Sequence, residues 1–406
     1  MSSGYELHQK LRTKTVRLLK KKQYSEAISA LHDGSLNLLS QGEQGSGCDL
    51  GIYMIDVYTT ASTPVDSESR DRITDILEKA APDFWRKKLV DAAVKWSIKA
   101  TGASTGDPLL RLWLGKMYAK EADYEHAEPH FLTSCVETEQ TYAVESAPIA
   151  YAKAMAEWLV KFAHMASEQE CEGRGIDAIT RIEAGRFALR ATIPLLANGA
   201  VKQAISFQES YLSTVTSSQK SLLLPVTPNP RPYVPPGSPA GASTELQLYL
   251  TANPDLNFSQ MAVALVSESL KIKTNSNGGA GRVPDWLRNA WLQLVRQYAR
   301  EAPALSHEDG VRAAIPQIGQ DWFGLQMQRQ GGNMLNDMMA NLFGGGTTQT
   351  AGGAKEKQIQ QQQIKGPGSA PKPLMAPTTV AQSAGTAPAS SSAKTVADDL
   401  LDDEMD

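Results

Sequence analysis

The sequence predicts an all-α protein, built as a right-handed solenoid of tetratricopeptide-like helical hairpins and followed by a disordered C-terminal tail. The clearest unit lies at residues 106–134, where apolar or small side chains recur at the spacing of two antiparallel helices. Asp107 is placed to cap the first helix, Pro108 lies in its first turn, and Ala122 with Asp123 forms the corner. One hairpin cannot bury both of its faces, so we expect further hairpins stacked on either side.

Composition is consistent with a protein that folds in water. The chain has 406 residues, 41% of them hydrophobic, which is enough to bury a large core. No apolar run approaches the ~18 residues of a membrane-spanning helix, and the N-terminal segment has no apolar signal core. Cys48, Cys135 and Cys171 are widely separated and odd in number, so we expect neither a disulfide framework nor a zinc site. A cytosolic location follows as the expectation.

Charge is unevenly distributed along the chain. The net charge is −4, and the last ten residues hold six carboxylates and no base. Without these six, 38 of the 44 acidic residues remain against 40 basic ones, so the rest of the chain is nearly neutral. Because nucleic-acid-binding proteins usually have a marked basic excess, we expect no nucleic-acid partner.

Helical periodicity continues along most of the chain, with short polar breaks. The first predicted helix runs from Tyr5 to Lys22, and leucines follow its inner face. Its outer side carries a basic stripe, namely Lys10, Lys14, Arg17 and Lys21. A solvated surface is the commoner explanation of such a stripe. A second helix is expected from Ser25 and a third from Asp49, after a glycine-rich loop at residues 41–47. Further helices are predicted at residues 70–80, 83–99, 143–166, 175–191, 194–212, 245–251, 258–273, 284–300 and 315–343.

Two acidic residues of the third helix form a candidate binding site. Asp49 and Asp56 are seven residues apart, which is two helical turns, so they project from nearly the same side. A helix-capping role is an equally good explanation of Asp49. Asp56 lies in mid-helix, where aspartate is a poor helix former and cannot cap. This acidic pair beside the basic first helix would suit a protein partner that carries charges of both signs.

Two segments interrupt the helical pattern. Residues 222–244 contain seven prolines and cannot be helical. A disordered insertion, a short hairpin at the solenoid's edge and a ligand for a proline-reading domain all fit, and we favour the insertion. From residue 344 the chain has no aromatic residue and cannot offset its ordering entropy by burial. The expected organisation is an N-terminal solenoid at 1–221, an insertion or loop at 222–244, a C-terminal helical part at 245–343, and a disordered tail at 344–406 with an acidic end.

Catalytic and metal-binding motifs are scarce. The glycine-rich residues 277–282 follow a helix and lack the context of a phosphate-binding loop. His126 and His130 lie four apart with Glu128 between them, but this order differs from that of zinc proteases. Surface or packing histidines are the better explanation. We therefore predict that the chain is not an enzyme and has no cofactor or metal site.

Several motifs, taken in order, resemble one protein family. They are YELHQKLRT with QYSEAI, LLSQGEQGSGCDL, KWS before GDPLL, YEHAEPHFLTS, DLNF and IGQDWFG, and they run from Tyr5 to about Phe343. The family is Golgi-to-ER traffic protein 4, also called the 35-kDa subunit of the transmembrane recognition complex. One such match would be weak, but collinear matches of this number make the resemblance specific.

The resemblance implies a non-enzymatic α-solenoid adaptor in the delivery of tail-anchored membrane proteins to the endoplasmic reticulum. In the family, the N-terminal half binds a cytosolic targeting ATPase, and the C-terminal half binds a ubiquitin-like co-chaperone partner. The adaptor promotes transfer of the client to the ATPase and does not itself insert into membranes. In the family, another helix usually precedes the one with which this chain begins. We therefore expect either that part of the ATPase-binding surface is missing or that the start codon is misassigned.

Specific residues follow from this resemblance. Asp49 and Asp56 match the family's acidic pair that influences the ATPase's nucleotide cycle. The surface that anchors the ATPase matches residues of the first helix, namely Tyr5, Arg12, Arg17 and Lys20. Large apolar residues are candidates for contacts with the ubiquitin-like partner, although each is more readily explained as core: Leu256, Phe258, Trp286, Trp291, Trp322 and Phe323.

Two other functions remain compatible with the sequence. A generic helical-repeat scaffold subunit would share the helical array without needing the acidic pair. A peptide-clamp co-chaperone adaptor would need a basic groove for acidic tails, which the basic stripe of the first helix would supply.

Overall fold

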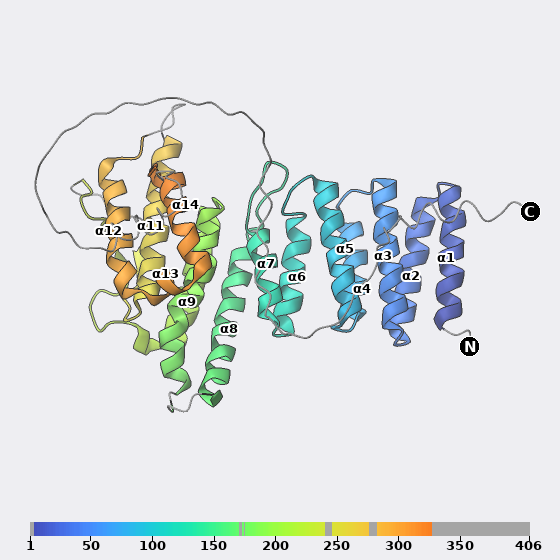
Figure 1. Ribbon diagram of the computed structural model, residues 1–406, viewed down its shortest axis with the longest axis horizontal. Helices are drawn as coiled ribbons and strands as arrows, with labels where there is room; N and C mark the ends of the chain where they lie inside the picture. Colours follow the sequence, from blue (N-terminus) through green and yellow to red (C-terminus); the bar gives the residue numbers. More distant parts are fainter. Residues whose placement is uncertain (1–3, 170–172, 174, 240–245, 276–281, 327–406) are drawn as a thin grey trace, which may run out of the picture. The chain divides into compact units, whose positions relative to one another are not determined.

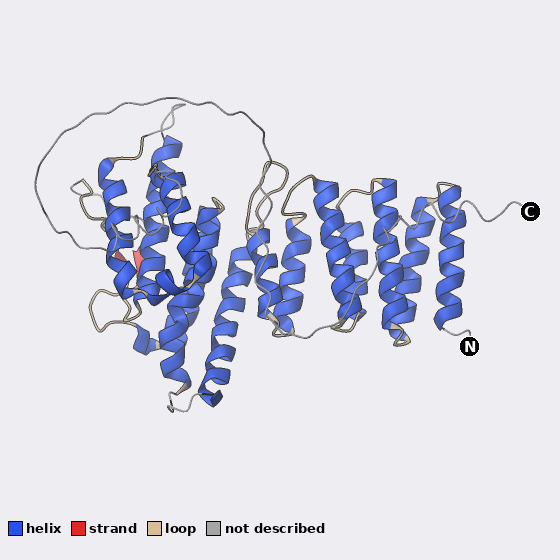
Figure 2. Ribbon diagram, viewed as in Figure 1, coloured by secondary structure: helices blue, strands red, loops and turns tan. Residues whose placement is uncertain are grey.

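The computed structural model describes residues 4–169, 173, 175–239, 246–275 and 282–326, and over these ranges its regular secondary structure is almost all helix (Figure 2). The helices are α1 (Gly4–Lys20), α2 (Tyr24–Ser40), α3 (Gln44–Ala61), α4 (Ser67–Lys79), α5 (Phe84–Thr101), α6 (Pro108–Lys120), α7 (Tyr124–Ser134), α8 (Ala147–Gln169), α9 (Ile176–Ala197), α10 (Val201–Ser218), α11 (Pro254–Asn275), α12 (Asp285–Glu301), α13 (Pro303–His307) and α14 (Asp309–Phe323). The predicted all-α class is confirmed. The predicted disordered tail lies outside the described residues.

Most helices that are neighbours in the chain pack against one another (Figure 1). Helix α2 packs on α1 and α3, α6 packs on α7, and α8 packs on α9 and α10. In the hairpin of α6 and α7, a Cβ atom at Gly115 would lie only 3.0 Å from Cδ1 of Phe131. A small residue therefore meets a large one across the hairpin, which is the pattern that predicts this solenoid from the sequence.

Four tight corners between helices share one backbone motif. At the corner of α6 and α7, Ala122 adopts a left-handed conformation with φ of 58°, and the Asp123 N–H donates to the Tyr118 carbonyl at 3.0 Å. The same six-residue hydrogen bond closes the corners that follow α1, α2 and α9, where the left-handed residues are Lys22, Gly42 and Gly199. This motif ends a helix and reverses the chain within three or four residues, which explains the short connections.

Helix α3 begins at Gln44, five residues earlier than the sequence suggests. The expected loop and the expected start at Asp49 are therefore wrong, and Asp49 lies inside the helix and does not cap it. The glycines that resemble a loop serve close packing instead. A Cβ atom at Gly47 would lie 2.6 Å from Cγ of Leu39, and one at Gly45 would lie 3.3 Å from the Trp85 ring.

The described part of the proline-rich region contributes one strand to a two-stranded antiparallel sheet. Strand β1 (Arg231–Pro232) pairs antiparallel with β2 (Gln247–Leu248), and Leu223 forms a bridge with Thr251. The helix expected at residues 245–251 is wrong, because its backbone bonds to residues outside a helix. For example, the Asn229 side chain accepts from the Leu250 N–H at 2.9 Å and donates to its carbonyl at 3.0 Å.

Helix α9 lies at the centre of the C-terminal helices, because α8, α10, α11 and α14 all pack against it. It runs unbroken through Pro194, so the break expected before that residue is wrong and the corner lies at Gly199. Helix α14 ends at Phe323, and Gly324 after it is left-handed, so the helix predicted at residues 315–343 is wrong at 324–326; its residues beyond 326 lie outside the described residues. None of the described helices combines the length and apolar character that crossing a bilayer requires.

Candidate functional site

The acidic pair lies on α3 beside α1, and one member is held by α1. The Asp49 carboxylate oxygen Oδ2 lies 2.8 Å from His8 Nε2 and accepts from Arg12 Nη1 at 3.0 Å. The Asp49 side chain is 41% exposed and that of Arg12 is 40% exposed. Their ion pair is therefore accessible from solvent. From the sequence, Arg12 is expected to contact the targeting ATPase, and its contact with Asp49 is not predicted. The role of His8 is not predicted either.

Asp56 is exposed and has a different environment from Asp49. Within the described ranges, no side chain donates a hydrogen bond to its carboxylate or forms an ion pair with it. Partial burial, and then the negative charge of Asp49, raise the pKa of Asp56 above its usual 3.8, while Lys95 of α5 lowers it. This carboxylate is therefore available to a partner that supplies a cation.

Tyr53 lies between the two carboxylates in the sequence of α3. The Arg12 guanidinium stands over its ring, 5.5 Å from the centroid. Burial raises the pKa of the Tyr53 hydroxyl, with Arg12 lowering it and Asp56 raising it. Together His8, Arg12, Asp49, Tyr53 and Asp56 form what we call the α1–α3 cluster, which presents charges of both signs beside an aromatic ring.

The four candidate residues of α1 do not all belong to this cluster. Tyr5, which is 68% exposed, shares one side of the helix with His8 and Arg12 through the spacing i, i+3, i+7. Arg17 lies roughly half a turn round the helix from that side. It belongs to the basic stripe, which lines a hollow of about 520 Å³ together with Gln9, Thr13 and Leu18. Lys20 is exposed and lies outside both groups.

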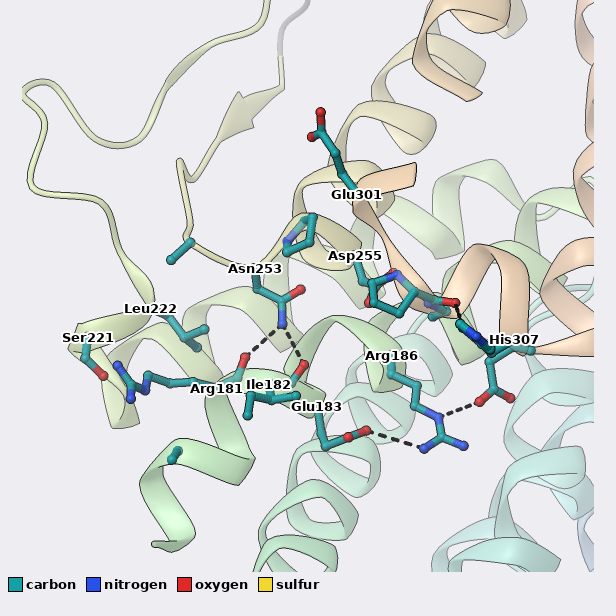
Figure 3. A pocket seen from close by; sticks show the side chains of 16 residues that line it. Arg181, Ile182, Glu183, Arg186, Ser221, Leu222, Asn253, Asp255, Glu301 and His307 are labelled. Atoms are coloured by element: carbon teal, nitrogen blue, oxygen red, sulfur yellow. Dashed lines mark hydrogen bonds and ion pairs between the residues drawn. The ribbon is translucent and has the colours of Figure 1, made fainter. Parts of the chain in front are cut away.

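A second hollow, of about 660 Å³, lies between α9 and the start of α11 and α13 (Figure 3). Arg186 of α9 ion-pairs with Glu308 at 2.5 Å and approaches Glu183 at 3.5 Å. Asp255, which is 6% exposed, accepts from the Ala304 N–H at 3.1 Å. Burial raises the pKa of Asp255 to about 6, although the Ala304 hydrogen bond lowers it.

The walls of this second hollow are fixed by close packing. The Asn253 amide donates to the carbonyls of Arg181 and Ile182 at 2.8 and 2.9 Å. A Cβ atom at Gly185 would lie 2.2 Å from Asn253 Oδ1 and 2.4 Å from the Leu256 backbone nitrogen. Helices α9 and α11 therefore touch at Gly185. These groups stabilise the junction and form no recognisable catalytic arrangement.

The structure separates the apolar candidates of the C-terminal part into two groups. Leu256, Phe258, Trp291 and Phe323 are at most 2% exposed. For example, the Trp291 and Phe323 rings stack with centroids 4.8 Å apart. These four side chains belong to the core and present no surface to a partner in this conformation. Trp286 and Trp322 are only partly buried, and Trp322 Nε1 donates to the Leu196 carbonyl at 3.0 Å.

His126 and His130 flank one aromatic ring, since both stack on Tyr118. His126 Nδ1 lies 2.9 Å from Asp123 Oδ1, and His130 Nδ1 lies 3.2 Å from Arg111 Nη1. Burial, and then the positive charge of Arg111, lower the pKa of His130 to about 4, so its ring is neutral near pH 7. Among the residues that the structure describes, no three acidic, histidine or cysteine side chains gather as a metal site would require.

Comparisons with known proteins point to one family. The family model described as Golgi to ER traffic protein 4 matches residues 21–343. A relative of that name from Aspergillus fumigatus is 26% identical over 375 residues, which are 89% of this chain and 90% of the relative. The relative from Schizosaccharomyces pombe is 32% identical over 34% of this chain and 45% of its own length. The human homologue is 30% identical over 32% of this chain and 40% of its own length.

A solved structure is similar to this chain in fold. The crystal structure of C. therm. Get4 aligns with a TM-score of 0.60 and 25% sequence identity, covering 84% of this chain and 90% of the solved one. The family model includes both members of the acidic pair but begins after α1. The candidate residues of α1 therefore lie outside that match.

Proposed function

Because this chain belongs to the Golgi to ER traffic protein 4 family, we propose that it is a non-enzymatic adaptor in the delivery of tail-anchored membrane proteins to the endoplasmic reticulum. It bridges a ubiquitin-like co-chaperone partner and a targeting ATPase in the cytosol, and it promotes transfer of the client between them. The N-terminal solenoid at residues 1–221 binds the ATPase, and the C-terminal part at 245–343 binds the ubiquitin-like partner.

The observation that carries this proposal is the α1–α3 cluster. Asp56 offers an exposed carboxylate without a protein partner among the described residues, two helical turns along α3 from Asp49, which Arg12 already holds. Because Asp49 already pairs with Arg12, only Asp56 is open to a cation from a partner. A partner can therefore bind in only one alignment, with its cation at Asp56. Charges in such a partly exposed interface set the encounter rate and orientation more than the affinity. These are the properties that an adaptor needs if it binds and releases an ATPase during each cycle.

Tyr5 and Arg12 extend the proposed ATPase surface along α1, and Arg17 and Lys20 are assigned to its edge. The exposed ring of Tyr5 is the strongest single anchor, since exposed aromatic residues are enriched among the residues that dominate interface energies. In the C-terminal part, Trp286 and Trp322 remain the candidates for the ubiquitin-like partner, because their rings are only partly buried.

Hydrogen exchange on the full chain tests both assignments. With the ATPase and ATP added, we expect amide exchange in α1 and α3 to slow while α12 is unchanged. With the ubiquitin-like partner added, we expect slowing at residues 246–326 and none in α1. Protection of both regions by one partner, or of neither by either partner, would overturn the division of labour proposed here.

A peptide-clamp function is the second candidate, and the hollow lined by the basic stripe supports it. A clamp of this kind would bind an acidic chaperone-tail peptide at the stripe and would not need Asp49 or Asp56. Binding of such a peptide that survives Asp56→Lys, together with no binding of the ATPase, would favour the clamp over the adaptor.

A further inference from the structure

Two adjacent aromatic side chains at the start of α5 are exposed to solvent. Phe84 is 61% exposed and Trp85 is 40% exposed, and their rings meet edge to face with centroids 5.5 Å apart. The Lys88 ammonium lies over both rings, 4.5 Å from the Phe84 centroid and 5.1 Å from that of Trp85. We call these three residues the α5 patch. Exposed apolar residues that occur singly are normal, but contiguous ones indicate an interaction surface.

Contacts within the fold hold the α5 patch in place. The Asp83 carboxylate caps α5 and accepts from the Trp85 N–H at 2.8 Å. A Cβ atom at Gly45 would lie 3.3 Å from the Trp85 ring, so glycine lets this ring lie against the start of α3. The cation of Lys88 attracts the faces of both rings. Because the rings are ordered before a partner arrives, binding costs them little conformational freedom.

Helices α3 and α5 pack together and run in the same direction. Near their starts, Gly45 of α3 lies against the Trp85 ring of α5. Further along, burial and then Asp49 raise the pKa of Asp56, and Lys95 of α5 lowers it, so Lys95 lies near Asp56. These two points of approach are 11 residues apart on α3 and 10 apart on α5. Equal separations in the same order mean that the two helices are parallel.

The α5 patch therefore continues the surface of the α1–α3 cluster onto a third helix. Asp49 and Asp56 share nearly one side of α3. Phe84, Lys88 and Lys95 recur at i, i+4 and i+11, so they share one side of α5. Because Lys95 acts on Asp56, these two sides are adjacent.

Charge and apolar character define the partner that fits this extended surface. Lys88 and Lys95 form no ion pair with a described residue, so both are open to carboxylates from a partner. The exposed rings suit large apolar side chains, and Asp56 suits a cation. An anionic lipid surface fits poorly, because Asp49 and Asp56 would repel its headgroups. A protein that carries charges of both signs around an apolar centre fits well.

We propose that the α5 patch binds the targeting ATPase together with the α1–α3 cluster, in one continuous interface. This assignment rests on the proposed function, and the continuity of the surface and its charges support it. The two parts of the interface act on different rates. Charges such as that of Asp56 guide association. The apolar contacts of the Phe84 and Trp85 rings slow dissociation.

Removal of one ring tests this division. In a full chain with Phe84→Ala, the complex with the ATPase and ATP should dissociate at least about tenfold faster, with an association rate within about twofold of the natural one. The matched control is Tyr142→Ala, which removes another exposed aromatic ring, 59% exposed, between α7 and α8. It should change neither rate. Urea unfolding of both variants checks that they remain folded.

Reversal of the cation gives a second, independent variant. Lys88→Glu should slow association with the ATPase by about fivefold at low salt and by less at high salt, because it repels the partner's carboxylates. The control Lys202→Glu makes the same change of charge at an exposed position on α10 and should have no effect.

Hydroxyl-radical footprinting of the natural chain needs no substitution. With the ATPase and ATP added, the Phe84 and Trp85 side chains should lose most of their oxidation, and Tyr142 should keep its own. If the ATPase binds but leaves both rings fully oxidised, or if Phe84→Ala dissociates at the natural rate, the α5 patch is not part of the interface and the proposed function stands. If the natural chain does not bind the ATPase at all, the proposed function is wrong and the assignment of the patch is wrong with it.

Discussion

Reversing the charge of Asp56 is the sharpest test of the α1–α3 cluster, because the carboxylate makes no hydrogen bond or ion pair with another described residue. In Asp56→Lys we expect the free energy of unfolding to change by less than about 0.5 kcal/mol, as for other surface substitutions. The new cation would lie near Lys95, which repels it, and near Asp49, which attracts it, so the two effects largely offset each other.

Binding of the targeting ATPase should respond far more than stability does. One exposed ion pair contributes about 0.2–1 kcal/mol, and reversing a charge removes that attraction and adds a repulsion. We therefore expect a loss of roughly 1–2 kcal/mol, or about 5–30-fold in Kd, mostly through slower association that depends on salt. Binding kinetics at two salt concentrations, with urea unfolding of the same samples, measure both quantities.

The matched control is Glu209→Lys. Glu209 is an exposed carboxylate on α10, far along the chain from the cluster, and its reversal changes net charge by the same amount. It should leave ATPase association unchanged. If Asp56→Lys binds the ATPase within about twofold of the natural chain, or if the control weakens binding equally, the assignment of the acidic pair is wrong.

Three further predictions concern the fold, and urea unfolding measures each. Ala122→Gly should stabilise the protein by about 0.5–1 kcal/mol, because glycine adopts the left-handed conformation at this corner without strain. The control Ala119→Gly, within α6, should destabilise the protein. If Ala122→Gly destabilises the protein, the residue is not strained. Gly185→Ala should cost at least about 2 kcal/mol, because its Cβ atom would lie 2.2 Å from Asn253 Oδ1, and a neutral result would contradict that close contact. Burial raises the pKa of Asp255 from 3.8 to about 6, so its contribution to stability is full below pH 4 and lost as pH rises through 6. Asp255→Asn keeps an acceptor for the Ala304 N–H but cannot ionise. The variant should be more stable than the natural chain by about 1–3 kcal/mol at pH 8 and by little at pH 4. A difference in stability that does not change with pH would contradict this prediction.

The sequence predicts the helices well where one face is apolar and a cap is visible. Asp107 does cap α6, since its carboxylate accepts from the Leu110 N–H at 2.7 Å. Two of the errors occur where glycine or proline has a packing role. Gly45 and Gly47 suggest a loop in the sequence, but they lie in a helix and allow close contacts with Trp85 and Leu39. Because those two residues belong to other helices, the local sequence does not show the contacts. Pro194 resembles a helix end, but α9 continues for three more residues.

The candidate site is only partly accessible from the sequence. Helical spacing does place Asp49 and Asp56 on nearly the same side of α3. It gives no information on His8 and Arg12, which reach Asp49 across 41 and 37 residues of chain. Spacing likewise does not distinguish Trp291, which is buried, from Trp286, which is only partly buried, because that difference depends on packing between α11, α12 and α14.

The most direct test of the adaptor function is a mass measurement on mixtures of the full chain, the ubiquitin-like partner and the targeting ATPase with ATP. Size-exclusion chromatography with light scattering gives the mass of each complex as it elutes. The proposed function predicts one complex that contains all three proteins. With Asp56→Lys, the complex should hold less ATPase at the same protein concentrations and keep the ubiquitin-like partner. Displacement of one partner by the other, or binding of neither, would contradict the proposal that this chain bridges them.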